Sequence, residues 1–205
     1  MKPYEIEQHS MEIIQREMGT WTGPSENLPI LKRVIHTTAD FDFKETLKFS
    51  KDAVNKAREA LKNGVTIITD TNMAAAGINK TTASQFGIEV ICRMAEPQIR
   101  EEALKRETTR AVISIEKAVE KTPNAIFAIG NAPTALIRLC ELIKDGKAHP
   151  SLVIGVPVGF VNVIESKEIL IATDVPYIVA MGRKGGSTIA SAIVNALLYG
   201  IDKKA

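Results

Sequence analysis

The sequence predicts an α/β fold with three layers, in which helices cover both faces of a mostly parallel sheet of about five strands. Three apolar runs carry this prediction, because each leads into a glycine-rich turn and then into a helical pattern. The runs are residues 125–129 before Gly130, 152–154 before Gly155 and 177–181 before Gly182. In open parallel sheets, ligands bind at the carboxyl ends of the strands. We therefore expect the three turns to line one edge of the sheet and to form the functional site.

The first part of the chain is predicted to be helical. Residues 4–18 carry an apolar stripe at helical spacing, and a loop is expected over 20–27. A second helix is expected from residue 26 to about 37, with Ser25 as its N-cap. Residues 40–49 favour neither helix nor strand.

Helices and strands then alternate. Ser50 is expected to cap a helix over 51–63, and two β-branched runs predict strands at 65–69 and 88–92. Three further helices are expected, at 71–76, at 98–121 with a break near Thr108 and Thr109, and at 188–198 after the last strand.

Composition limits the functional classes. The 205 residues suit a single domain over 1–205, with 45% apolar and 24% charged residues, as in soluble proteins. A net charge of +2 is too small to indicate a nucleic-acid partner. The chain start has no signal-peptide pattern, and the longest apolar stretch, 152–164, is too short to span a membrane. We therefore expect a cytoplasmic protein.

Cys92 and Cys140 lie in apolar surroundings and are expected to be buried thiols.

His36 is the histidine with the clearest chemical setting. It lies near the predicted C-terminal end of its helix, three residues after Arg33, so that the two side chains share a face. The helix end favours the imidazolium and the arginine opposes it, a balance that suits acid–base catalysis near neutral pH. The alternative is a histidine that only hydrogen-bonds the end of the helix.

The glycine-rich turns suit anions. Residues 182–187 combine Arg183 and Lys184 with the peptide N–H groups at a helix start, although a plain tight turn explains the same pattern. Asn131 adds an amide to the turn at Gly130. Arg110, near another helix start, is either a surface arginine or an anion contact. Residues 70–73 also end a strand, with Asp70 either joining this edge or capping its helix.

Four motifs in order resemble the precorrin-8X methylmutase family and its cobalt-precorrin-8 counterpart. They are residues 33–36 (RVIH), 130–136 (GNAPTAL), 157–161 (PVGFV) with 165–167 (ESK), and 182–187 (GRKGGS). The resemblance spans residues 10–198. It implies an isomerase that moves a methyl group from C-11 to C-12 of a corrin-type macrocycle, yielding hydrogenobyrinate or its cobalt form without a cofactor.

The resemblance also implies roles for residues. His36 is similar to the family's acid–base histidine, and Ser10, Arg33 and Arg110 fall on its substrate contacts. Because the substrate carries several carboxylates, we also expect contacts at the glycine-rich turns, from Asn131, Arg183, Gly185, Gly186 and Ser187. The resemblance further implies a homodimer with substrate near its interface. From charge and hydropathy we expect no nucleic-acid and no membrane partner.

Two alternatives remain at this point. One is a nucleotide-binding α/β enzyme that uses residues 182–187 for phosphate, although no dinucleotide fingerprint or phosphate-binding P-loop is present. The other is a non-catalytic protein that holds a tetrapyrrole. No pattern of histidines or cysteines indicates a metal site.

Overall fold

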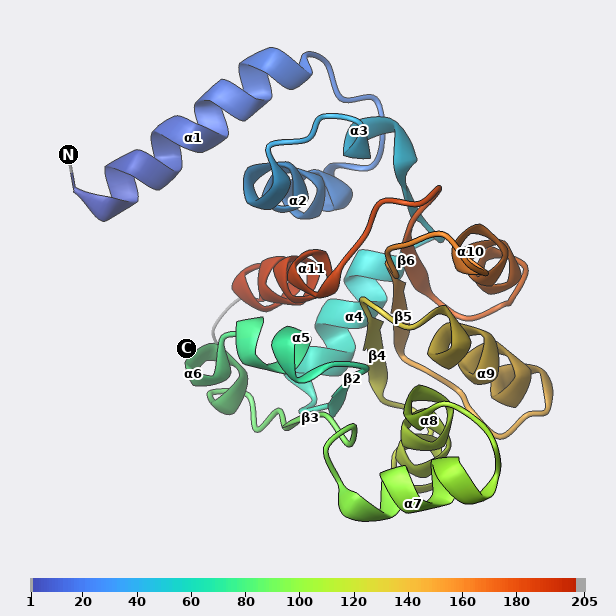
Figure 1. Ribbon diagram of the computed structural model, residues 1–205. Helices are drawn as coiled ribbons and strands as arrows, with labels where there is room; N and C mark the ends of the chain where they lie inside the picture. The colour runs from blue at the N-terminus through green and yellow to red at the C-terminus, as the bar shows by residue number, and fades with distance from the viewer. Residues whose placement is uncertain (1, 202–205) are drawn as a thin grey trace.

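A six-stranded sheet in the order β1-β6-β5-β4-β2-β3 forms the centre of the protein (Figure 1). The computed structural model describes residues 2–201. The strands are β1 (Leu47–Phe49), β2 (Ile67–Thr69), β3 (Val90–Ile91), β4 (Ile126–Ile129), β5 (Leu152–Gly155) and β6 (Tyr177–Ala180). Adjacent strands are parallel, except that β1 pairs antiparallel with β6. The five expected strands are present. The sixth, β1, comes from residues 40–49, whose sequence favours neither helix nor strand.

Helices make up most of the remaining structure. They are α1 (Pro3–Met18), α2 (Leu28–Thr38), α3 (Phe43–Thr46), α4 (Ala53–Lys62), α5 (Asn72–Gly77), α6 (Lys80–Ser84), α7 (Pro97–Lys105), α8 (Arg110–Lys121), α9 (Pro133–Lys144), α10 (Val163–Ile171) and α11 (Ser187–Tyr199). A 3-10 turn, Ser25–Asn27, precedes α2. The predicted break between α7 and α8 is confirmed, and Thr109 caps α8 by accepting a hydrogen bond from the N–H of Val112.

The two faces of the sheet are buried by different helices. In β4, Ile126 and Ala128 belong to the apolar cluster that includes α2, α4 and α11. Phe127 and Ile129 belong to the cluster formed with α8, α9 and α10. Successive side chains of a strand point to opposite faces, so a strand covered on both sides must be apolar throughout. Figure 1 shows the resulting three layers, with α8, α9 and α10 on the right of the sheet and α4 and α11 on its left, which confirm the predicted architecture.

Two predicted helix caps are wrong. Ser25 begins the 3-10 turn instead of capping α2, which starts at Leu28 with Pro29 in its first turn. Ser50 does not cap α4, because its Oγ accepts a hydrogen bond from the N–H of Tyr177 at 2.9 Å. Its own N–H donates to the carbonyl of Tyr177 at 3.0 Å, so Ser50 extends the pairing of β1 with β6.

The single domain over residues 1–205 stays a prediction, and residues 1 and 202–205 lie outside the described residues. Within residues 2–201, every helix is too short or too polar to cross a membrane. Cys140 is buried and Cys92 is partly buried, and both are free thiols.

Candidate active site

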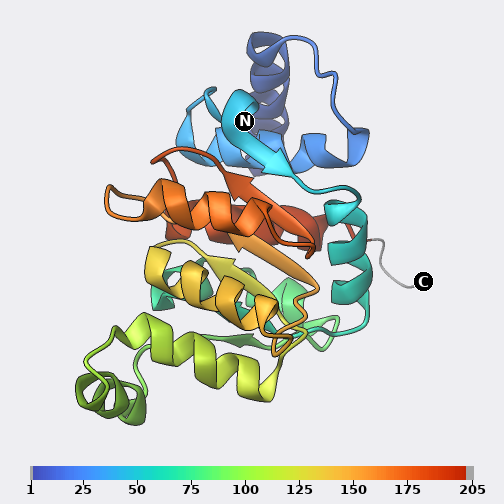
Figure 2. The same cartoon turned by 90° about the vertical axis from the view of Figure 1, so that its right-hand side faces the viewer.

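The loops after β4, β5 and β6 lie along one edge of the sheet, because these strands are parallel neighbours. We call this region, residues 70–73, 130–132, 156–162 and 181–187, the carboxyl edge. It faces the viewer in Figure 1 and lies on the left-hand side of Figure 2. The predicted gathering of the three glycine-rich turns is therefore confirmed.

Asp70 connects two of these loops from inside the protein. Its side chain is buried, and it accepts hydrogen bonds from the N–H groups of Gly130 at 2.9 Å and of Asn131 and Ala132 at 2.7 Å each. Burial raises the pKa of this carboxyl group, and the three N–H donors oppose that change. Asp70 does not cap its own helix, since Thr71 accepts the hydrogen bond from Ala74. Asp70 thus joins the edge, and its role there is to hold the start of α9.

The glycine-rich turns pack backbone against backbone. A Cβ on Gly130 would lie 2.7 Å from the Cα of Ser187, and one on Gly185 would lie 2.2 Å from the carbonyl oxygen of Val156. The N–H of Gly186 donates to that same oxygen at 2.8 Å. Only glycine permits such close approaches. Gly185, predicted to contact substrate, therefore also has a packing role, whereas Gly186 has space for a Cβ but a positive φ angle of 135°.

Two basic residues of the last loop differ in their partners. The Nζ of Lys184 lies 2.6 Å from carboxylate oxygens of both Asp40 and Asp42, which joins this loop to the segment after α2. The guanidinium of Arg183 lies 5.6 Å from the ring centre of Phe160. Among the described residues Arg183 forms no ion pair, so its charge is available to an anion.

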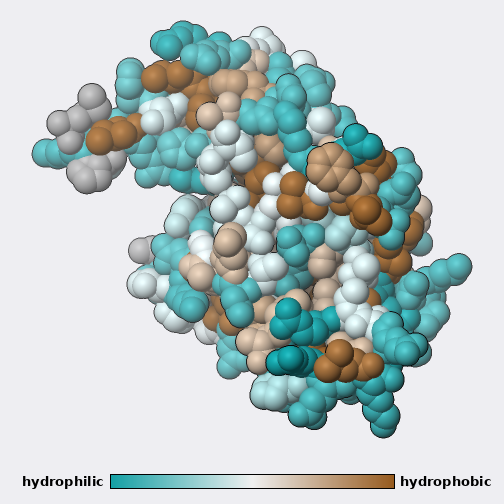
Figure 3. All heavy atoms as spheres, in the orientation of Figure 1, coloured by the Kyte–Doolittle hydropathy of each residue, from teal (hydrophilic) through white to brown (hydrophobic). Residues whose placement is uncertain are grey.

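The carboxyl edge exposes apolar side chains beside these polar ones. Phe160 is 83% exposed, Val161 78% and Met73 67%. Figure 3, seen from the same side as Figure 1, shows apolar side chains grouped over α10 and the loop before it. An exposed apolar patch with a neighbouring guanidinium suits a large ligand that carries carboxylates on an apolar ring.

Arg33 connects α1, α2 and α11. Its Nη2 atom lies 2.7 Å from Oε1 of Glu7, and its guanidinium lies 5.6 Å from the ring centre of Tyr199. It also lines a cavity of about 400 Å³ with residues of α1, α4 and α11. Ser10 lies one turn after Glu7 on α1, and its Oγ donates to the carbonyl of Ile6 at 2.8 Å.

His36 lies one turn after Arg33 and is exposed. No described residue forms a hydrogen bond with its ring. Because Asp40 and Asp42 bind Lys184, the end of α2 lies beside the loop that follows β6. Figures 1 and 2 show that α2 ends on the same side of the molecule as the carboxyl edge. The other histidines stand apart: His9 lies 3.7 Å from Glu12 on α1, and His149 is exposed in a turn.

Arg110 occupies a different part of this side of the molecule. It is the first residue of α8, is exposed and lines a cavity of about 470 Å³ with residues of α7. The hydroxyls of Thr109 and Thr134 lie 3.2 Å apart and join the starts of α8 and α9. No contact among the described residues links Arg110 to Arg33 or His36.

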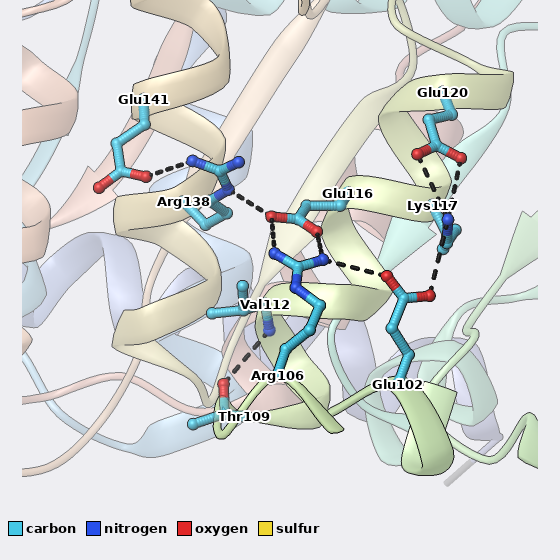
Figure 4. A network of polar contacts seen from close by, with 9 residues as sticks. All are labelled: Glu102, Arg106, Thr109, Val112, Glu116, Lys117, Glu120, Arg138 and Glu141. Carbon is cyan, nitrogen blue, oxygen red and sulfur yellow. Dashed lines mark hydrogen bonds and ion pairs between the residues drawn. The ribbon is translucent and has the colours of Figure 1, made fainter. Parts of the chain in front are cut away.

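A network of ion pairs joins α7, α8 and α9 (Figure 4). Glu116 binds both Arg106 and Arg138, and these hydrogen bonds lower the pKa of its carboxyl group. Arg106 also binds Glu102, and Arg138 binds Glu141. The network therefore ties α8 to α7 and α9.

Residues 165–167 were part of a sequence motif, but the sequence predicted no role for Lys167. Lys167 on α10 is fully buried and binds two carbonyl oxygens of the 182–187 loop. A lysine among apolar residues of a short helix was the available signal. Within residues 2–201, no cluster of three His, Cys, Asp or Glu side chains is placed to hold a metal ion.

Comparison with known proteins decides the family. Residues 5–200 match the family described as precorrin-8X methylmutase. This chain belongs to the precorrin-8X methylmutase family. The resemblance predicted from its motifs is confirmed, and membership makes the chain an isomerase of the methylmutase type.

Members of this family are similar to the chain over most of its length. Cobalt-precorrin-8 methylmutase of Priestia megaterium is 44% identical over 197 residues, which cover 96% of this chain and 88% of that protein. The Salmonella typhimurium protein of the same name is 48% identical over 171 residues, covering 83% and 80%. A crystal structure described as precorrin-8X methylmutase from Thermus thermophilus is 42% identical, covers 95% and 96% of the two chains, and has a TM-score of 0.87.

Proposed function

We propose that this chain moves a methyl group from C-11 to C-12 of precorrin-8X or cobalt-precorrin-8, giving hydrogenobyrinate or cobyrinate. One observation carries the proposal: His36 and Arg33 share the last turns of α2, and the segment after α2 binds the 182–187 loop through Lys184. An acid–base group and anion-binding groups therefore border the same surface. Membership of the methylmutase family favours this reaction over nucleotide chemistry.

His36 acts on the macrocycle as a general acid. Its ring has no partner among the described residues, so it is available to protonate or hydrogen-bond a ring nitrogen near the migrating methyl group. Drawing electron density toward that nitrogen assists a 1,5-shift, in which the bond from the methyl carbon to C-11 breaks as the bond to C-12 forms. The shift is internal to the macrocycle and consumes neither a methyl donor nor an oxidant.

The basic and hydroxyl groups bind the carboxylates of the substrate. Arg33 and Arg183 supply the charged contacts, with Ser10, Asn131 and Ser187 as neutral donors and Gly185 and Gly186 shaping the loop. Arg110 binds a more distant carboxylate. We further propose a cytoplasmic homodimer with substrate near its interface. The separation of Arg110 from Arg33 within one subunit supports a site to which two subunits contribute.

A direct assay tests the reaction. Purified protein is mixed with precorrin-8X, with and without cobalt, and the visible spectrum is followed for the corrin chromophore, with His36→Ala as the control. Conversion by the parent protein and its loss in the variant are expected. A protein that binds hydrogenobyrinate tightly but never converts precorrin-8X would instead be a tetrapyrrole carrier.

A further inference from the structure

Lys167 is a charged side chain in an apolar setting. It lies in the middle of α10, is fully buried and points toward the loop between β6 and α11. Charged side chains are almost never fully buried unless they are paired. No carboxylate among the described residues pairs with this ammonium group, and burial lowers the pKa of Lys167 to about 8. Its only described partners are two carbonyl oxygens.

Those carbonyls belong to one loop of the candidate active site. The Nζ of Lys167 donates to the carbonyl of Gly182 at 2.7 Å and to that of Lys184 at 2.9 Å. Arg183 stands between the two tethered residues and is exposed. Pulling the flanking carbonyls into the protein fixes the peptide planes on either side of Arg183, and this determines where its side chain leaves the backbone.

The loop needs such a tether because its backbone is irregular. Gly182 and Gly186 have positive φ angles of 78° and 135°. Other ties of the loop are the N–H of Gly186 to the carbonyl of Val156, the N–H of Gly159 to the carbonyl of Arg183, and the hydroxyl of Ser187 to that of Thr71. Lys167 holds the first half of the loop from inside the protein, while Lys184 holds it at the surface and Thr71 holds its end at Ser187.

We propose that Lys167 is a positioning residue that fixes the 182–187 loop so that Arg183 and Ser187 meet the substrate. This inference rests on the proposed function of the carboxyl edge. Lys167 acts through the loop and does not touch the macrocycle.

Enzyme kinetics provide the first test. Lys167→Met keeps an unbranched side chain but removes every donor, and Lys167→Gln keeps two N–H donors. We expect Lys167→Met to raise KM at least about tenfold with kcat changed less than about threefold, and Lys167→Gln to raise KM less. A double variant gives a second kinetic test. Arg183→Ala alone is expected to raise KM as well. The double variant Lys167→Met with Arg183→Ala is expected to raise KM no more than the larger of the two single substitutions does. Additive effects on KM, or an unchanged KM in both Lys167 variants, would overturn the proposal. Lys121→Met, at an exposed site outside the loop, is the matched control.

Hydrogen exchange provides a test that needs no turnover. In Lys167→Met, or in Lys167→Gln if the methionine variant does not fold, the amides of residues 182–187 should exchange at least about tenfold faster. The amides of β4 should be unchanged. If the loop amides exchange at the same rate in the variant and in the parent protein, Lys167 does not hold the loop. If the parent protein converts no precorrin-8X but the loop exchange rises as expected, the proposed reaction fails and the positioning of the loop stands.

Discussion

The hydroxyl oxygens of Thr71 and Ser187 lie 2.8 Å apart, although 116 residues separate them in the chain. Thr71 caps α5, which follows β2, and Ser187 is the first residue of α11, which follows β6. Gly130, at the end of β4, makes room for Ser187 because it has no side chain. Three loops of the carboxyl edge therefore meet at one point.

Removing the Ser187 hydroxyl should weaken this junction. Ser187→Ala is expected to lower the free energy of unfolding by about 0.5–1.5 kcal/mol, the range for one neutral hydrogen bond. Urea denaturation measures the change. Thr71→Ser keeps both the hydroxyl and the cap and serves as the control. A Ser187→Ala variant as stable as the parent would show that the contact adds nothing to stability.

Asp70→Asn should be more damaging than its size suggests. The substitution replaces an acceptor oxygen by an NH2 group that faces peptide N–H donors of residues 130–132. At least one buried donor loses its partner, so we expect about 1–3 kcal/mol of destabilisation. Thermal and urea denaturation check this value. Asp174→Asn, at an exposed carboxylate, should change stability by less than about 0.5 kcal/mol, and equal effects at the two sites would contradict the prediction.

His36→Asn should separate catalysis from stability. The ring is exposed and bonded to no described residue, so the free energy of unfolding should change by less than about 0.5 kcal/mol. The rate of methyl migration should fall about 100-fold or more if proton transfer matters. Single-turnover spectroscopy gives the rate. A loss below about tenfold would leave the histidine only an orienting role.

Arg33→Ala should weaken substrate binding by about 1.5–3 kcal/mol if the guanidinium makes one charge-assisted hydrogen bond. Fluorescence or absorbance titration with hydrogenobyrinate measures the affinity. Glu7→Gln is the matched control, because it removes the negative charge of the internal partner and keeps the guanidinium. Affinity in that variant should be unchanged or higher. Unchanged affinity in Arg33→Ala would remove Arg33 from the site.

Lys167 should give stability a pH dependence of unusual sign. The pKa of Lys167 is about 8 in the folded protein, whereas 10.5 is the ordinary value for a lysine and applies to the unfolded chain. Between these values the unfolded chain keeps a proton that the folded chain has released, so this residue adds stability as the pH rises. The full gain in the free energy of unfolding is about 3 kcal/mol. Well below pH 8 both states are protonated, so Lys167 contributes no pH dependence there.

Urea denaturation of the parent and Lys167→Met at pH 7.5 and pH 10 isolates this contribution, because other groups titrate alike in both proteins. The stability of the parent relative to the variant should increase at the higher pH. A constant difference would show that the ammonium group is not held with a lowered pKa.

The sequence predicted the parts of the fold that depend on local pattern. Long apolar runs followed by glycine marked β4, β5 and β6, and Thr108 and Thr109 marked the break between α7 and α8. The three-residue strand β1 carries too short a pattern to be recognised, since its pairing with β6 defines it.

Features that depend on remote partners were out of reach. Ser50 fits a helix cap locally, but the backbone of Tyr177 engages it. Asp70 and Thr71 are both good caps, and only the nearby start of α9 decides that Asp70 turns inward. In the candidate site the sequence marked His36 and Arg33, whereas the partners of Lys167 become visible only when α10 lies beneath the last loop.

The meeting of Thr71, Gly130 and Ser187 also bears on the order of folding. α11 leaves the ribosome after every other described element, yet it supplies one side of this junction. During synthesis the preceding strands and helices can form, and Asp70 can already join two of the loops, but the Thr71–Ser187 contact is missing until the final helix docks. Contacts so distant in the chain form slowly, and we expect nascent chains lacking α11 to bind no pigment.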